Sequence, residues 1–232
     1  MRGKGSPELR AMGWETLLQM WGLLLDYYDV PDQPPDDRDI ASWYGEQTLN
    51  GLLAAAVWKI PGGWSLQEFT GEKTPQAKKQ SKRRRGDMWL GFEKQRRTFT
   101  IEAKVAWLNS TVSQAAVKEI ASKLTCAWSQ LDTLHKSHAK YCEGCPMAVV
   151  YAVPWLPANV ESSNEDRVKR LFIDIPKQFS NPTTLTAVYR CQGDWPKWME
   201  KKYGERVYPG VVFIGKYWTS FTGEDFQKMR WS

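Results

Sequence analysis

The chain has 232 residues, of which 42% are hydrophobic and 25% are charged, and its formal net charge is +6. This length and balance are typical of one globular domain with a substantial core, so we expect a single domain over residues 1–232. No apolar run reaches about 20 residues, and the N-terminal residues do not resemble a signal peptide, which argues against membrane insertion and secretion. We therefore expect a cytoplasmic protein with reduced cysteines.

Two helices are expected before the first strands. Apolar residues recur at helical spacing from Pro7 to about Tyr28, and again from about Asp37 to Trp58. The second helix carries Glu46 on its apolar stripe, where an unpaired carboxylate is costly. We expect Glu46 to cap or pair with a neighbour, to lie at the margin of the stripe, or to turn toward a functional site.

A basic segment follows a predicted edge strand over residues 64–69. Residues 72–85 contain seven Lys or Arg residues and one acidic residue, which sums to +6, so the rest of the chain is neutral. Such a run is an electrostatic footprint for phosphate, although a solvated loop or a localisation signal has the same composition. The candidate residues for nucleic-acid binding in this segment are Lys78, Lys79, Lys82, Arg83, Arg84 and Arg85.

The residues directly after the basic segment predict a β-hairpin. Apolar and polar side chains alternate over residues 87–93 and 98–105, and a short polar stretch joins the two runs. A three-residue loop between the two strands would shift the register by one residue. Asp87 would then lie on the face opposite to the polar side chains of residues 98–105. A symmetric loop instead sets Asp87 directly opposite Lys104, with Glu102 as its diagonal neighbour, so that two carboxylates and a lysine converge.

This convergence has a specific chemical use. Two carboxylates at that separation can share a divalent cation, and Mg²⁺ prefers one or two carboxylates together with waters and phosphate oxygens. A lysine beside the ion can orient a water or stabilise the transition state of phosphodiester hydrolysis. Taken alone, Glu-x-Lys on a strand more often marks a solvated face. Here the Glu-x-Lys sequence follows Asp87, the helical Glu46 and the basic segment, and this combination favours a catalytic site.

After the hairpin, the pattern predicts one long helix and three further strands. Residues 109–111 offer N-caps for a helix that continues to about Lys136, and the run 147–153 is apolar throughout, as in a central strand. Two more strands are expected at 185–191 and 210–217, after a shorter helix. The order of these elements predicts an α/β fold with a mixed central sheet flanked by helices.

Both histidines of the chain and two of its four cysteines lie close together in the sequence. They are His135, His138, Cys142 and Cys145. Such a set can bind a structural Zn²⁺ ion tetrahedrally, although its spacing is tighter than in familiar zinc motifs. A plain turn that leads into the apolar strand explains the same residues.

The arrangement of an Asp followed by Glu-x-Lys on adjacent strands resembles the PD-(D/E)xK nuclease superfamily, with Gly86 in place of the Pro before the Asp. The resemblance implies that Asp87 and Glu102 bind the metal ion and that Lys104 assists the attacking water. It also implies that the main-chain carbonyl of Ala103 is an additional metal ligand. Mg²⁺ is the implied ion, and Mn²⁺ should substitute for it.

The resemblance extends beyond the hairpin. It implies a restriction-endonuclease-like core over about residues 37–155, with residues 156–232 as a C-terminal elaboration. It implies that an upstream helical acid, here Glu46, completes or supports the metal site. It further implies that a Gln on the long helix lies near the phosphate, and Gln114 and Gln130 are both candidates.

The function expected from these features is metal-dependent hydrolysis of nucleic acid, of DNA rather than RNA, as an endonuclease or an exonuclease. Cleavage of paired strands would call for a homodimer or a partner subunit. One alternative is a non-catalytic module that binds nucleic acid through the basic segment and through some of the thirteen tryptophans, which otherwise serve core packing. Another is a protein-interaction module of a phage or defence system.

Overall fold

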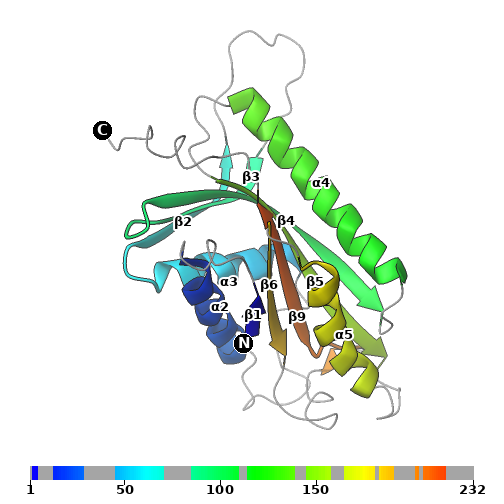
Figure 1. Cartoon of the computed structure of the whole chain (residues 1–232). Helices are drawn as coiled ribbons and strands as arrows, with labels where there is room; N and C mark the ends of the chain where they lie inside the picture. The colour runs from blue at the N-terminus through cyan, green and yellow to red at the C-terminus, as the bar shows by residue number, and fades with distance from the viewer. Residues whose placement is uncertain are drawn as a thin grey trace.

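A mixed sheet lies at the centre of the computed structural model. Its seven principal strands follow the order β1-β6-β9-β5-β4-β3-β2, and the short pair β7–β8 attaches to β5 (Figure 1). The neighbours β4 and β5 are parallel, and the other neighbouring strands are antiparallel. The structure describes residues 2–4, 13–28, 45–70, 85–109, 114–138, 145–157, 165–180, 183–190, 202–203 and 206–217.

Strands and helices are interspersed along the chain, as predicted for an α/β fold. The strands are β1 (Arg2–Lys4), β2 (Gly63–Thr70), β3 (Arg85–Phe92), β4 (Arg97–Asn109), β5 (Cys145–Pro157), β6 (Thr184–Arg190), β7 (Lys202–Tyr203), β8 (Arg206–Val207) and β9 (Gly210–Tyr217). The helices are α2 (Glu15–Tyr28), α3 (Glu46–Trp58), α4 (Gln114–His138) and α5 (Glu165–Gln178). The predicted mixed sheet flanked by helices is confirmed, whereas β1, β7 and β8 were not expected because they are too short to show a periodic pattern.

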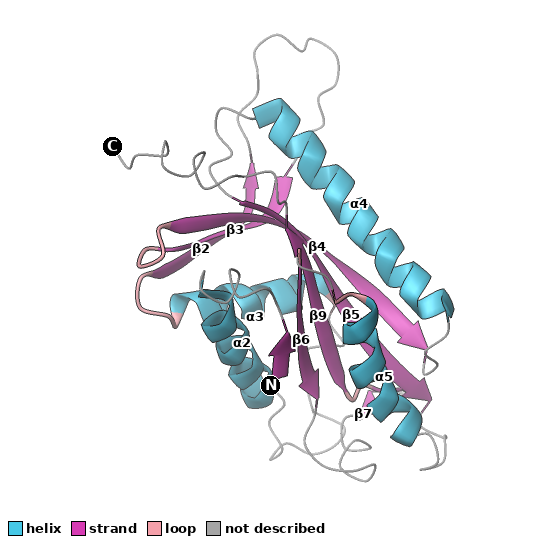
Figure 2. Cartoon of the chain, viewed as in Figure 1, coloured by secondary structure: helices cyan, strands magenta, loops and turns pink. Residues whose placement is uncertain are grey.

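Helices cover both faces of the central strands. Helices α2 and α3 lie on one side of the sheet, and α4 and α5 lie on the other (Figure 2). Because β5 is covered on both sides, all its residues from 145 to 154 are buried, as the apolar run predicted. Among the described helices, none is long and apolar enough to span a membrane.

Aromatic side chains fill the layer between α2 and the sheet. Trp14 contacts Phe99 edge-to-face at 5.3 Å between ring centroids, and Trp21 lies 5.7 Å from Tyr151. Both tryptophans are fully buried, and Phe213 of β9 contacts each of them. Edge-to-face pairs of this kind stabilise a core beyond the area that they bury. At these positions, the high tryptophan content therefore serves core packing.

Helix α3 begins later than the sequence pattern indicated, whereas the predicted start of the first helix at Pro7 lies outside the described ranges. The described part of the first helix starts at Glu15, and residues 5–12 lie outside the described ranges. Helix α3 starts at Glu46, directly after Gly45, whose φ of 79° turns the chain into the helix. Since a positive φ favours glycine, Gly45 sets this boundary, and Glu46 becomes the first helical residue.

Candidate active site

The turn between β3 and β4 is centred one residue earlier than predicted. Phe92 pairs with Arg97, so the four residues 93–96 form the turn. The Arg96 amide donates a hydrogen bond to the Glu93 carbonyl at 3.0 Å, and Arg96 has a left-handed φ of 48°. A non-glycine residue rarely adopts this conformation, so nothing in the local sequence marked the position of the turn.

The predicted register of the hairpin is therefore wrong by two residues. Met88 pairs with Ile101, and one further step of this ladder sets Asp87 opposite Glu102 rather than opposite Lys104. Because side chains alternate with a period of two, an error of two residues leaves the faces unchanged. The three candidate side chains of the hairpin consequently share one face, as predicted.

The site forms where β3 separates from β4. The ladder ends at Met88 and Ile101, and beyond it the Ala103 amide donates a hydrogen bond to Asp87 Oδ2 at 2.7 Å. The carboxylate of Asp87 thus takes the place of a main-chain acceptor. The carbonyl of Ala103 accepts a hydrogen bond from Lys104 Nζ at 2.6 Å, so both main-chain polar groups of Ala103 belong to the site.

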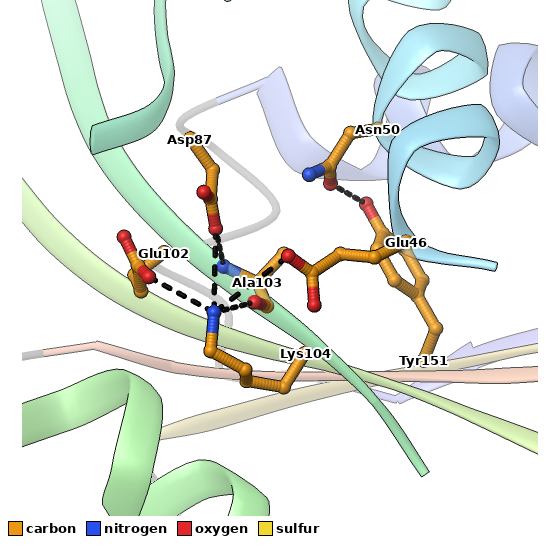
Figure 3. Close-up of polar contacts among 7 residues, drawn as sticks. All are labelled: Glu46, Asn50, Asp87, Glu102, Ala103, Lys104 and Tyr151. Carbon is orange, nitrogen blue, oxygen red and sulfur yellow. Dashed lines mark hydrogen bonds and ion pairs between the residues drawn. The ribbon is translucent and has the colours of Figure 1, made fainter. Parts of the chain in front are cut away.

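The ammonium group of Lys104 is the centre of the cluster. Its Nζ lies 2.9 Å from Glu102 Oε1, 3.6 Å from Glu46 Oε1 and 3.7 Å from Asp87 Oδ2 (Figure 3). These acids come from β4, α3 and β3 respectively. Three acids from three separate elements therefore converge on one lysine. Together, these four side chains are the ones that the sequence had singled out.

Glu46 reaches the cluster from the first position of α3. Its side chain is 33% exposed, and the charge of Lys123 on α4 also acts on it. A carboxylate at a helix N-terminus is favoured by the helix dipole. Lys123 was not singled out in the sequence, where it resembled any surface lysine of a long helix. Its ion pair with Glu119, four residues earlier on α4, gave no hint of the site.

The cluster contains three acidic side chains and one lysine. Burial, followed by the neighbouring charge of Asp87, raises the pKa of Glu102 from 4.5 to about 7. Burial also raises the pKa of Glu46, against the opposing charge of Lys104. Burial acts to lower the pKa of Lys104, but the hydrogen bond and charge of Glu102 and the other acids outweigh it and raise that pKa. Lys104 therefore stays charged, and its one positive charge faces three carboxyl groups.

The donor chemistry fits a hard divalent cation. Carboxylate oxygens and a main-chain carbonyl are the ligands that Mg²⁺ uses in proteins, and surplus negative charge favours such an ion. Asp87, Glu102 and the Ala103 carbonyl supply these donors, with Glu46 beside them. Within the described ranges, no group of three or more His, Cys, Asp or Glu side chains is arranged to hold a metal as it stands. Here the acids contact the ammonium of Lys104 instead.

The other predicted residues are not members of this cluster, or they lie outside the described part of the chain. Gln114 and Gln130 are both exposed on α4. Arg85 begins β3 and pairs with Thr70, and the remaining basic candidates lie in residues 71–84, outside the described ranges. Of the four zinc candidates, Cys145 is buried at the start of β5. Cys142 and the two histidine side chains lie outside the described part, so the zinc site stays a prediction.

A buried polar pair behind the site was missed in the sequence. The Tyr151 hydroxyl on β5 donates a hydrogen bond to Asn50 Oδ1 at 2.8 Å, and both side chains are buried. Asn50 lies one helical turn after Glu46, so this bond fixes the start of α3 against the central strand. The two residues are 101 positions apart in the chain, and no local pattern connects them.

Removing the Tyr151 hydroxyl should destabilise the fold. The Tyr151→Phe substitution leaves Asn50 Oδ1 buried without its donor, which is expected to lower the free energy of unfolding by about 1–3 kcal/mol. Urea titration of the variant measures this change. Tyr27→Phe is the matched control, because Tyr27 is 79% exposed and should change stability little. Equal stability of both variants would contradict the assigned role of the pair.

Comparisons with known proteins do not identify the class of this protein, so only its fold and its site define that class. No family model, curated protein or solved structure matches the chain. The class is thus an α/β protein with a carboxylate–lysine cluster at the point where two adjacent strands of a mixed sheet diverge.

Proposed function

We propose that the protein is a divalent-metal-dependent nuclease that hydrolyses phosphodiester bonds, with DNA as its substrate in preference to RNA. The observation that carries this proposal is the convergence of three carboxylates on the Lys104 ammonium. Fixed acids and a lysine in one partly buried place supply metal ligands and a cationic group for a phosphate. A purely structural ion pair would need one acid, and the extra carboxylates favour a cation-dependent role.

Each residue of the cluster has a distinct proposed role. Asp87 and Glu102, with the Ala103 carbonyl, would hold Mg²⁺ or Mn²⁺, and Glu46 would support them. The ion, when bound, would lower the pKa of a water and neutralise charge on the phosphate. The amide of Ala103 orients the Asp87 carboxylate. Lys104 would orient the attacking water and stabilise the negative charge that develops on the phosphate oxygens.

The proposal includes a restriction-endonuclease-like core. Its support is the run of elements from α3 to β5, which are a helix, three antiparallel strands, a helix and a strand parallel to β4. This run covers residues 46–157, close to the span that the sequence resemblance assigned. The elements that follow extend the sheet on its other side through β9, β6 and β1.

Metal-dependent cleavage tests the proposal directly. The wild type should cut supercoiled plasmid or single-stranded DNA in Mg²⁺ or Mn²⁺ but not in EDTA. The Asp87→Asn variant should cut about 100-fold more slowly or worse, because its neutral amide lacks the negative charge of the metal-binding carboxylate. Asp174→Asn is the matched control, since Asp174 forms an exposed ion pair with Lys177 on α5 and should not affect cleavage.

Two results would count against the nuclease. Normal cleavage by folded Asp87→Asn would show that the site lies elsewhere. Folded wild type that cuts neither DNA nor RNA with any metal, yet binds nucleic acid equally well in EDTA, would favour the non-catalytic binding module.

A further inference from the structure

The face of the sheet that carries the carboxylate cluster continues onto the two outer strands. Trp89 lies two residues after Asp87 on β3, and side chains at that spacing share a face about 7 Å apart. Leu66 of β2 pairs with Trp89, and Trp64 pairs with Gly91. Directly paired residues lie on the same face, so Trp64, Leu66 and Trp89 form one strip beside Asp87, which we call the tryptophan strip.

The opposite face of these outer strands is covered. The Ser65 hydroxyl donates a hydrogen bond to the Ala54 carbonyl of α3 at 3.3 Å, and Gln67 approaches Gly51 of the same helix. On the strip's own side, α4 packs chiefly on β4 and β5 and contacts β3 only slightly, and β2 extends away from it (Figure 1). Leu66 is accordingly 51% exposed, and Trp64 and Trp89 are partly exposed.

The strip has a defined geometry. The rings of Trp64 and Trp89 are nearly perpendicular, at 88°, with centroids 4.9 Å apart. Trp64 lies against Gly91 so closely that an added Cβ there would come within 2.5 Å of the indole ring. A glycine at position 91 is therefore required to seat Trp64. The chain holds two partly exposed indoles in a fixed arrangement instead of burying them.

We propose that the tryptophan strip binds the bases of single-stranded nucleic acid next to the carboxylate cluster. Stacking on an indole needs an open base face, which a duplex does not offer. The basic segment connects β2 to β3, and Thr70 and Arg85 at its ends pair with each other close to Asp87. The two ends of the basic segment therefore lie at the end of the strip where the cluster lies, and the composition of this segment suits the phosphates. This proposal rests on the proposed nuclease function only in placing the cleaved phosphate at the carboxylate cluster. The binding of bases by the strip does not depend on that function.

Binding of a fluorescein-labelled oligothymidylate in EDTA tests the strip without cleavage. The Trp89→Leu variant should bind about tenfold more weakly than wild type, and Trp89→Phe should recover most of the affinity, because one stacked base is lost and then restored. Trp58→Leu is the matched control. Trp58 is 62% exposed, but it ends α3 on the opposite side of the sheet, so its loss should leave binding unchanged.

A second variant keeps the proposal testable if Trp89→Leu fails to fold. Leu66→Glu places a negative charge on the strip at a half-exposed position, and it should weaken oligothymidylate binding at unchanged melting temperature. Ile173→Glu on α5, at a site that is 54% exposed, is its control. Binding equal to wild type by folded Leu66→Glu, or equal binding of the oligomer as a duplex with oligoadenylate, would overturn the proposal.

The two proposals fail in different experiments. Absence of cleavage by the wild type would refute the nuclease and leave the binding result in EDTA intact. Oligothymidylate binding equal to wild type by the folded strip variants, with metal-dependent cleavage intact, would refute the strip alone.

Discussion

Replacing Lys104 with Met is expected to abolish cleavage, with a loss of about 100-fold to 10,000-fold in rate. Met keeps much of the aliphatic length of Lys, so the change chiefly removes the ammonium that lies between the three acids. The attacking water then loses its orienting group, and the phosphate loses a positive charge. Single-turnover cleavage in Mg²⁺ measures the effect.

The same variant should bind divalent cations more tightly than wild type. In the metal-free protein, Lys104 is the cation that the acids contact, so it competes with a metal ion for Glu102 and Asp87. Its removal should also lower the stability in EDTA by about 2 kcal/mol, and Mn²⁺ should restore the loss. Isothermal titration with Mn²⁺ and urea unfolding measure the two effects independently of cleavage.

The control for Lys104→Met is Lys177→Met on α5. Lys177 also pairs with an acid, but its side chain is 61% exposed, so neither Mn²⁺ affinity nor cleavage should change. Weaker Mn²⁺ binding by Lys104→Met would show that the lysine assists the metal ion and does not compete with it. Undiminished cleavage would remove Lys104 from the reaction.

The stability of the metal-free protein should fall as the pH rises from about 5 to about 8. The folded protein raises the pKa of Glu102 from 4.5 to about 7, so the folded state binds this proton more tightly than the unfolded state. The resulting stabilisation is fully present below pH 4.5 and is lost as the pH rises through about 7. The difference amounts to about 3 kcal/mol at most, and the raised pKa of Glu46 acts in the same direction.

Urea unfolding in EDTA across this pH range measures the effect. Glu102→Gln keeps the shape of a protonated Glu but cannot ionise, so its stability should change much less with pH than that of the wild type. Glu93→Gln, in the exposed β3–β4 turn, should behave as wild type. A parallel pH dependence for wild type and Glu102→Gln would contradict the assignment of the titration to Glu102.

Much of the hairpin could be predicted because its signal is local. Alternation, together with a symmetric loop, placed Asp87, Glu102 and Lys104 on one face, and this placement survived a register error of two residues, because the side-chain period is two. The continuous apolar run predicted β5 as a central strand for a similar reason, since a strand buried on both faces has no polar side. By itself, the sequence therefore determined the mixed α/β class and three members of the cluster.

Only the tertiary structure decided how these side chains meet. The Ala103 amide reaches Asp87 because β3 leaves β4 at that point, and Glu46 reaches Lys104 because α3 begins directly after Gly45. Both contacts depend on where a strand ends or a helix begins, and the periodic pattern of the sequence does not indicate these positions. The Asn50–Tyr151 bond and the open face of the tryptophan strip depend on how distant elements pack. Contacts between residues far apart in the chain are set by the packing of whole elements, which local periodicity does not encode.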